Sequence, residues 1–133
     1  MTNRRQFLKQ SSGLLGLSAF DFSKRTQPLL AFSTLGCPSW NFSQVLQNAA
    51  ANQYSGIEIR GINGDLDLPK HPIFSATQIA ATHRQVSDAG LKIVNLGSSA
   101  NMHFLDPKKR QTNLDEAKKY IELASQLACP FIR

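Results

Sequence analysis

Glu58 and Arg60 are the residues whose types and spacing most clearly suggest chemistry. They alternate with Ile57 and Ile59, so in a β-strand both side chains point to the same side, near the strand's carboxyl end. A carboxylate and a guanidinium in this position can bind substrate hydroxyl groups, or can form hydrogen bonds to a metal ligand and so orient it. The alternative is a buried ion pair between the two that serves only the fold.

A second group of polar residues is expected in a loop after the next apolar run. Amide, hydroxyl and imidazole groups suit the recognition of a sugar, because a neutral polyol needs hydrogen-bond donors and acceptors rather than charge. The alternative is that these residues simply form turns. Trp40, after the first apolar run, is a platform for a sugar ring or a cover for the rim of the sheet. The polar loop residues are Asn95, Ser98, Ser99, Asn101 and His103.

The histidines His71, His83 and His103 show neither i, i+4 spacing nor close carboxylates, so no metal ligand is assigned in this chain. There is no glycine-rich phosphate loop and no serine or cysteine in an elbow context, so no catalytic residue is assigned either. The basic run 108–110 is read as a solvated loop or, less simply, as a group that captures the phosphate of a sugar phosphate.

These candidates must be positioned by a regular alternation of strands and helices that begins at residue 29. Each helix is expected to open with a capping pair: Asn41 with Gln44, Ser75 with Gln78, and Asn113 with Glu116. A β-α-β order requires crossover connections and therefore a parallel sheet covered by helices. The strands are expected at 29–35, 57–60, 91–96 and 131–133.

Two long loops, 61–74 and 97–112, follow the second and third expected strands. Loops at the carboxyl ends of parallel strands carry the binding chemistry of α/β proteins. Cys37 and Cys129 are expected at opposite ends of the sheet, roughly 17–20 Å apart, which is too far for a disulfide. We therefore predict two free thiols.

The composition fits one small folded domain behind a separate leader. The chain has 133 residues and a formal net charge of +6, but five of its fifteen basic residues lie within residues 1–25. The rest is nearly balanced, which argues against a nucleic-acid partner. No apolar run is long enough for a stable membrane anchor.

The leader resembles a bacterial twin-arginine export signal. Arg4 and Arg5 are followed by Phe7 and Leu8 and then by a mildly apolar stretch. Residues 1–27 are therefore read as a signal and linker, recognised by an export receptor, and the protein is expected in the periplasm. An amphipathic helix with a basic face is the alternative.

Residues 28–133 resemble the sugar phosphate isomerase/epimerase family, the xylose isomerase-like TIM barrels that also include endonuclease IV-like proteins. The resemblance rests on the order and spacing of segments 54–61, 114–124 and 130–133. It implies the first four strands of a (β/α)8 barrel, and an enzyme that moves a proton next to a sugar carbonyl. It also implies a divalent metal held by carboxylates and a histidine. In the family these ligands come from the second half of the barrel, so none is carried over.

Two other readings stay open beside the enzyme. One is an exported barrel that binds carbohydrate without catalysis, and the other is a small open α/β binding domain. A half barrel exposes a strand edge and an apolar face, so self-association is also expected. Residues 1–133 alone are predicted to be inactive on a sugar or sugar phosphate.

Overall fold

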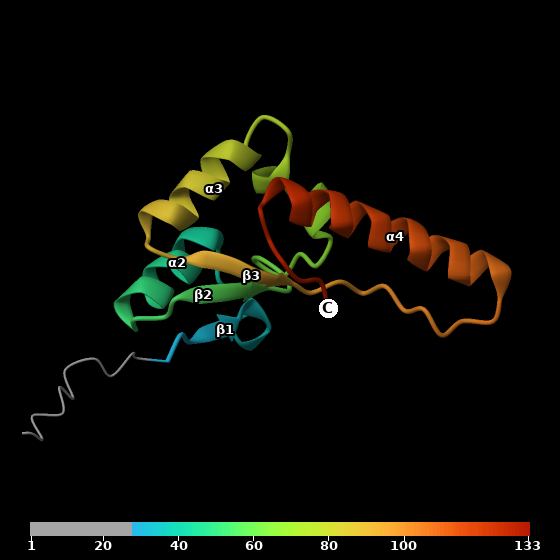
Figure 1. Ribbon diagram of the computed structural model, residues 1–133, viewed down its shortest axis with the longest axis horizontal. Helices are drawn as coiled ribbons and strands as arrows, with labels where there is room; N and C mark the ends of the chain where they lie inside the picture. The colour runs from blue at the N-terminus through green and yellow to red at the C-terminus, as the bar shows by residue number, and fades with distance from the viewer. Residues whose placement is uncertain (1–27) are drawn as a thin grey trace, which may run out of the picture.

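The computed structural model describes residues 28–133, so the expected export signal, with Arg4, Arg5, Phe7 and Leu8, lies outside the described residues. The described part is an α/β domain with a parallel sheet in the order β1-β2-β3 (Figure 1). This confirms the predicted class and the parallel sheet. The strands are β1 (Ala31–Ser33), β2 (Gly56–Ile59) and β3 (Lys92–Leu96), and the helices are α2 (Phe42–Ala51), α3 (Ile79–Asp88) and α4 (Pro107–Gln126).

The segment after α4 returns to the sheet beside β3, as a fourth parallel element. Leu96 and Ile132 form a parallel bridge. The backbone N–H of Leu96 donates to Phe131, and that of Arg133 donates to Leu96, at 3.1 and 2.8 Å. The predicted fourth strand therefore takes its expected place, although its pairing is limited to this bridge.

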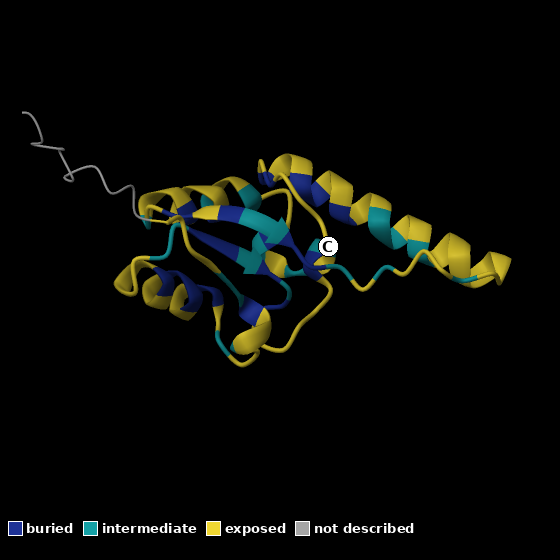
Figure 2. Ribbon diagram, turned by 60° about the horizontal axis from the view of Figure 1, so that its bottom comes forward, coloured by how far each residue is buried: buried dark blue, intermediate teal, exposed yellow. Residues whose placement is uncertain are grey.

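One face of the sheet carries the hydrophobic core. Ile57 and Ile59 of β2 are fully buried, and Ile93 and Leu96 lie opposite them on β3. These residues form a single cluster with buried side chains of all three helices, whose dark-blue sides face the sheet in Figure 2. The three helices therefore pack on the same face. Crossovers between parallel strands are nearly always right-handed, so strands added in sequential order produce this one-sided cover.

A β-bulge in β3 determines what the other face presents. Ile57 pairs with Ile93 whereas Glu58 pairs with Asn95, so Val94 is the extra residue. Strict alternation would send Asn95 to the core side with Ile93. The bulge instead places both Val94 and Asn95 on the side of Glu58.

Gly56 makes room for this bulge. A Cβ atom at Gly56 would lie 2.7 Å from Cγ1 of Val94. A side chain cannot occupy that space unless Val94 shifts, so the glycine follows from the irregular pairing.

The predicted capping box of α2 is confirmed. Oδ1 of Asn41 accepts from the N–H of Gln44 at 2.9 Å, and Oε1 of Gln44 accepts from the N–H of Asn41 at 2.9 Å. Both bonds satisfy N–H groups that have no partner within the helix.

The other two predicted caps are wrong. α3 begins at Ile79 with no side-chain cap, because the hydroxyl of Ser75 contacts Thr77 and does not receive the N–H of Gln78. α4 begins at Pro107 rather than at Asn113, with Asp106 accepting from the N–H of Lys109 at 2.8 Å. Proline favours the first helical position, where no N–H is needed.

The first strand is shorter than expected, and the long loop after β2 contains regular turns. β1 ends at Ser33 and continues as a 3-10 turn, Thr34–Gly36, and the loop 61–74 contains two 3-10 turns, Leu68–Lys70 and Pro72–Phe74.

Cys37 and Cys129 are both free, as predicted. Within residues 28–133, no helix has the length and hydropathy needed to cross a membrane.

Candidate functional site

The polar face of the sheet is organised around the carboxylate of Glu58. Oε1 accepts from Oγ of Ser33 at 3.0 Å, and Oε2 accepts from Nδ2 of Asn95 at 2.8 Å. Arg133 pairs with the same carboxylate through Nη2. Each residue comes from a different strand or strand-like segment, at its carboxyl end. We call Ser33, Glu58, Asn95 and Arg133 the Glu58 cluster.

The Glu58 cluster favours the charged form of its carboxylate. The Glu58 side chain is only 17% exposed, and this burial by itself would raise its pKa. The hydrogen bonds from Arg133, Asn95 and Ser33 outweigh burial and lower the pKa below its ordinary value. Glu58 is therefore an ionised hydrogen-bond acceptor at neutral pH.

Arg60 follows Glu58 on β2 but serves a different partner. Its Nη2 donates to Oγ of Ser99 at 2.7 Å, and its side chain crosses Gly97, where a Cβ atom would lie 2.5 Å from Cδ of Arg60. The salt bridge of Glu58 within residues 28–133 is with Arg133. The structure therefore gives no support to an ion pair between Glu58 and Arg60.

Two polar atoms in this region are buried without a hydrogen-bond partner among the described residues. They are Oδ1 of Asn95 and Nη1 of Arg60. Buried polar atoms are nearly always paired in folded proteins, so such atoms call for an explanation. One is an acceptor and the other a donor, so each is able to form a hydrogen bond with a hydroxyl group.

The other predicted site residues lie apart from this carboxylate. Trp40 is partly buried and packs against the hydrophobic core. Ser98 donates its backbone N–H to Arg133 at 2.6 Å, while its hydroxyl accepts from Ala100. The exposed ring of His103 packs against Phe104, with centroids 4.5 Å apart.

Sequence reasoning missed two members of the Glu58 cluster. Ser33 occupies the same register position on β1 as Glu58 on β2, so strand pairing could have indicated it. Arg133 follows the only residue of the fourth segment that bridges to β3. No sequence signal fixes which partner such an arginine takes.

A polar groove lies next to Arg60, between the loop after β2 and the helix α4. Its volume is about 520 Å³. Its charged groups are largely engaged: Lys70 pairs with Asp67 at 2.6 Å, and Glu116 accepts from the N–H of Ser99 at 3.0 Å. The groove is lined by Leu66, Asp67, Pro69, Lys70, Ser99, Thr112, Asp115, Glu116 and Lys119.

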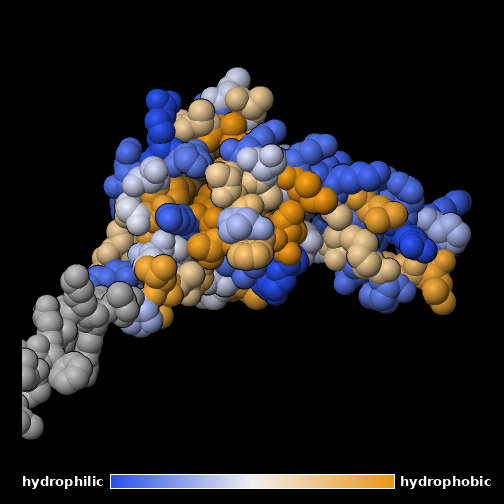
Figure 3. All heavy atoms as spheres, viewed as in Figure 1, coloured by the Kyte–Doolittle hydropathy of each residue, from blue (hydrophilic) through white to orange (hydrophobic). Residues whose placement is uncertain are grey.

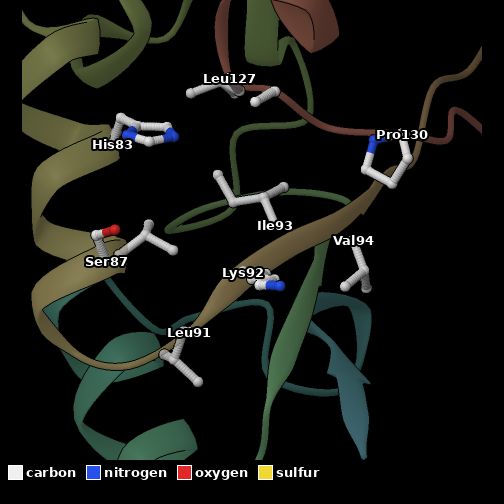
Figure 4. Close-up of a pocket in the computed structure, with 10 residues that line it drawn as sticks. His83, Ser87, Leu91, Lys92, Ile93, Val94, Leu127 and Pro130 are labelled. Carbon is white, nitrogen blue, oxygen red and sulfur yellow. The ribbon is translucent and has the colours of Figure 1, made fainter. Parts of the chain in front are cut away.

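A second groove, of about 420 Å³, lies between α3, β3 and the segment after α4 (Figure 4). Its lining is mainly aliphatic, from residues such as Ile93, Leu127 and Pro130, and His83 stands at its edge. His83, Ser87 and Lys92 also line it, but no hydrogen bond or ion pair joins these three side chains. We therefore assign no reaction to this groove.

The described residues do not fit the metal that the family resemblance implies. Within residues 28–133, no three His, Cys, Asp or Glu side chains come together in a way that could hold an ion. Both oxygens of Glu58 are already occupied by hydrogen bonds. No step of a reaction is therefore assigned to a metal bound by these residues.

Comparison with protein-family models and with curated protein sequences finds no match to this chain.

Proposed function

We propose that residues 28–133 form the amino-terminal part of a (β/α)8 barrel that belongs to an exported sugar or sugar phosphate isomerase or epimerase. The observation that carries the proposal is the Glu58 cluster, which gathers neutral and charged hydrogen-bonding groups from four neighbouring strand segments. Their common position, at the carboxyl ends of parallel strands, is where barrel enzymes hold their substrates.

The strand order supports a barrel over an open doubly wound sheet. In doubly wound proteins the order reverses at one point, so helices cover both faces and the ligand binds at the reversal. Here β1, β2, β3 and the segment 131–133 lie in sequential order, and the core occupies one face. In a closed barrel the face with Glu58 would be the interior.

Glu58 is assigned a binding role rather than that of a general base. A general base works best with a pKa near the operating pH, whereas the hydrogen bonds here lower the pKa of Glu58. Its charge holds Asn95 in place, with Oδ1 of Asn95 directed to accept from a substrate hydroxyl. Arg60 supplies a donor at Nη1.

The chemical step needs groups that these residues do not supply. A divalent metal beside a sugar carbonyl would stabilise the negative charge that develops when the neighbouring proton leaves. Since the described residues form no such site, we expect residues 1–133 alone to bind a sugar weakly and to show no isomerase turnover.

A non-catalytic carbohydrate-binding barrel is the second candidate. It is favoured by one observation, namely that every oxygen of Glu58 is committed to hydrogen bonds within the protein. A carboxylate held in this way orders a binding surface but does not accept a proton readily.

Sugar binding is tested by titrating the full chain with a panel of aldoses, ketoses and their phosphates while the chemical shifts of the backbone amides are measured by NMR. We expect shifts at Ser33, Glu58 and Asn95, and a loss of affinity of about tenfold in Asn95→Ala, because the variant lacks the free acceptor. Asn48→Ala is the matched control, since Asn48 is an exposed amide on α2. Equal affinity in both variants, or shifts confined to other regions, would contradict the proposal.

The export proposal is tested separately, with residues 1–27 fused to a reporter that is active only after folded export. Replacing Arg4 and Arg5 by lysine should reduce export at least tenfold, because the receptor reads the arginine pair. The control variant Arg25→Gln leaves that pair intact and should leave export nearly unchanged. Equal export by both variants would show that the leader is not of this type.

A further inference from the structure

The loop after β3 and the first half of α4 form an arm that projects from the domain (Figure 1). We define the arm as residues 99–116. The buried residues of α4 are Tyr120, Leu123 and Ala124, all in its second half. The first half of the helix therefore packs on the loop rather than on the core.

The loop is held on the helix by specific contacts. The N–H of Ser99 donates to Glu116 at 3.0 Å, and the N–H of Asn101 donates to Oδ1 of Asn113 at 2.7 Å. Asn113 and Glu116, which the sequence analysis predicted to form a helix cap, thus accept hydrogen bonds from the loop. These two bonds fix the position of the loop along the first half of α4.

The outer end of the arm exposes apolar side chains. Leu105 is 98% exposed and Met102 is 52% exposed. Transfer of a leucine side chain out of water is favourable by about 1.5–3 kcal/mol. Leu105 would therefore gain free energy if a surface covered it. Figure 3 shows hydrophobic atoms at this end, next to hydrophilic ones.

The same end is basic. Lys108, Lys109 and Arg110 lie three to five residues after Leu105 and are all exposed. The nearest carboxylate along the sequence, that of Asp106, accepts from the backbone N–H of Lys109 as the helix cap. Lys109 also lies over the ring of Phe104, with 5.7 Å between Nζ and the ring centroid, which fixes its position beside the apolar residues.

We propose that this tip docks on an anionic lipid surface. Basic residues near such a surface are attracted by its negative potential, and apolar side chains between them enter the headgroup region. A protein partner is less suitable, because a stable protein interface buries about 800 Å² on each side and the tip offers only a few apolar groups. The proposal does not depend on the barrel or on sugar binding.

The test is flotation of the full chain with vesicles of phosphatidylcholine and phosphatidylglycerol in a 3:1 ratio, beside vesicles of phosphatidylcholine alone. Replacing Lys108, Lys109 and Arg110 by glutamine should weaken binding to the anionic vesicles about 100-fold. Leu105→Asp should weaken it about tenfold or more. Ile121→Asp is the control, since Ile121 is exposed on the same helix but outside the arm. All variants keep residues 1–27, so a contribution from the leader is common to them.

A second measurement locates the contact. Tryptophan introduced by Leu105→Trp should be quenched by brominated lipid in anionic vesicles, whereas tryptophan introduced by Ile121→Trp should not. Equal flotation of wild type, Leu105→Asp and the glutamine variant would overturn the proposal, because another part of the chain would then carry the binding. Loss of flotation in the glutamine variant without quenching at position 105 would also overturn it, in favour of a purely electrostatic contact such as an acidic protein would make.

Discussion

The two faces of the sheet are made by the same strands but obey different rules. On the helix side, Ile57 and Ile59 are fully buried in one apolar cluster. On the other side, Glu58 and Asn95 are linked by hydrogen bonds and are only partly covered. The helix side stabilises the fold by burial, where a change in side-chain volume is costly, whereas the polar side is held by directional hydrogen bonds.

The largest expected difference between the faces comes from shortening one apolar side chain on each. Ile59→Ala should destabilise the domain by about 3–4 kcal/mol, because it leaves a cavity in a fully buried site. Val94→Ala, on the partly covered face, should cost less than about 1 kcal/mol. Urea denaturation monitored by circular dichroism measures both. Equal costs would mean that the polar face is packed as tightly as the core, and the distinction between the faces would fail.

A second prediction concerns the bulge that separates the faces. Gly56→Ala should cost about 1–3 kcal/mol, because its Cβ would meet Val94 at 2.7 Å. The double variant Gly56→Ala, Val94→Ala should recover a large part of this loss, since the obstructing methyl group is gone. A double-mutant cycle in urea gives the coupling energy. Additive effects would show that Val94 does not limit the space at Gly56.

The third prediction addresses the charge at the centre of the polar face. Glu58→Gln should cost about 1–2 kcal/mol at pH 7, reduced from the value for a buried ion because Arg133 is largely exposed. The folded-state pKa of Glu58 is lowered, so its stabilisation is fully present above its ordinary value of 4.5 and is lost as pH falls through the folded pKa. The difference in stability between wild type and Glu58→Gln should therefore shrink as the pH falls below about 4.5.

Glu122→Gln is the matched control for this pH dependence, since Glu122 is an exposed glutamate on α4. It should follow the wild-type curve throughout the acid range. A constant gap between wild type and Glu58→Gln from pH 7 to pH 3 would mean that the carboxylate charge contributes nothing to folding.

The alternation of apolar and amphipathic segments was enough to predict the parallel sheet and the start of α2. The cap at Asn41 was predictable because both halves of its reciprocal pairing are local. Asn113 and Glu116 show the same spacing, yet they accept backbone N–H groups from the loop 97–106. A sequence pattern records which bonds a pair can make, but tertiary contacts decide which partners it receives.

The candidate site was predictable to a smaller extent. Glu58 was found because its place at the end of a strand depends only on alternation. Its interaction with Asn95 depends on the bulge, and its interaction with Arg133 depends on the return of the chain after α4. Neither is visible in the local sequence, and the alternative of an ion pair between Glu58 and Arg60 was drawn from their nearness along one strand.

The bulge at Val94 has a consequence for how this strand can change in evolution. Most substitutions at Val94 alter only a partly covered surface, so the position should accept many residue types. Deleting it would place Asn95 directly after Ile93, so regular alternation would still direct Asn95 to the side of Glu58 and Leu96 to the core. We expect natural variants of β3 to differ in the residue at this position, and some of them to lack it.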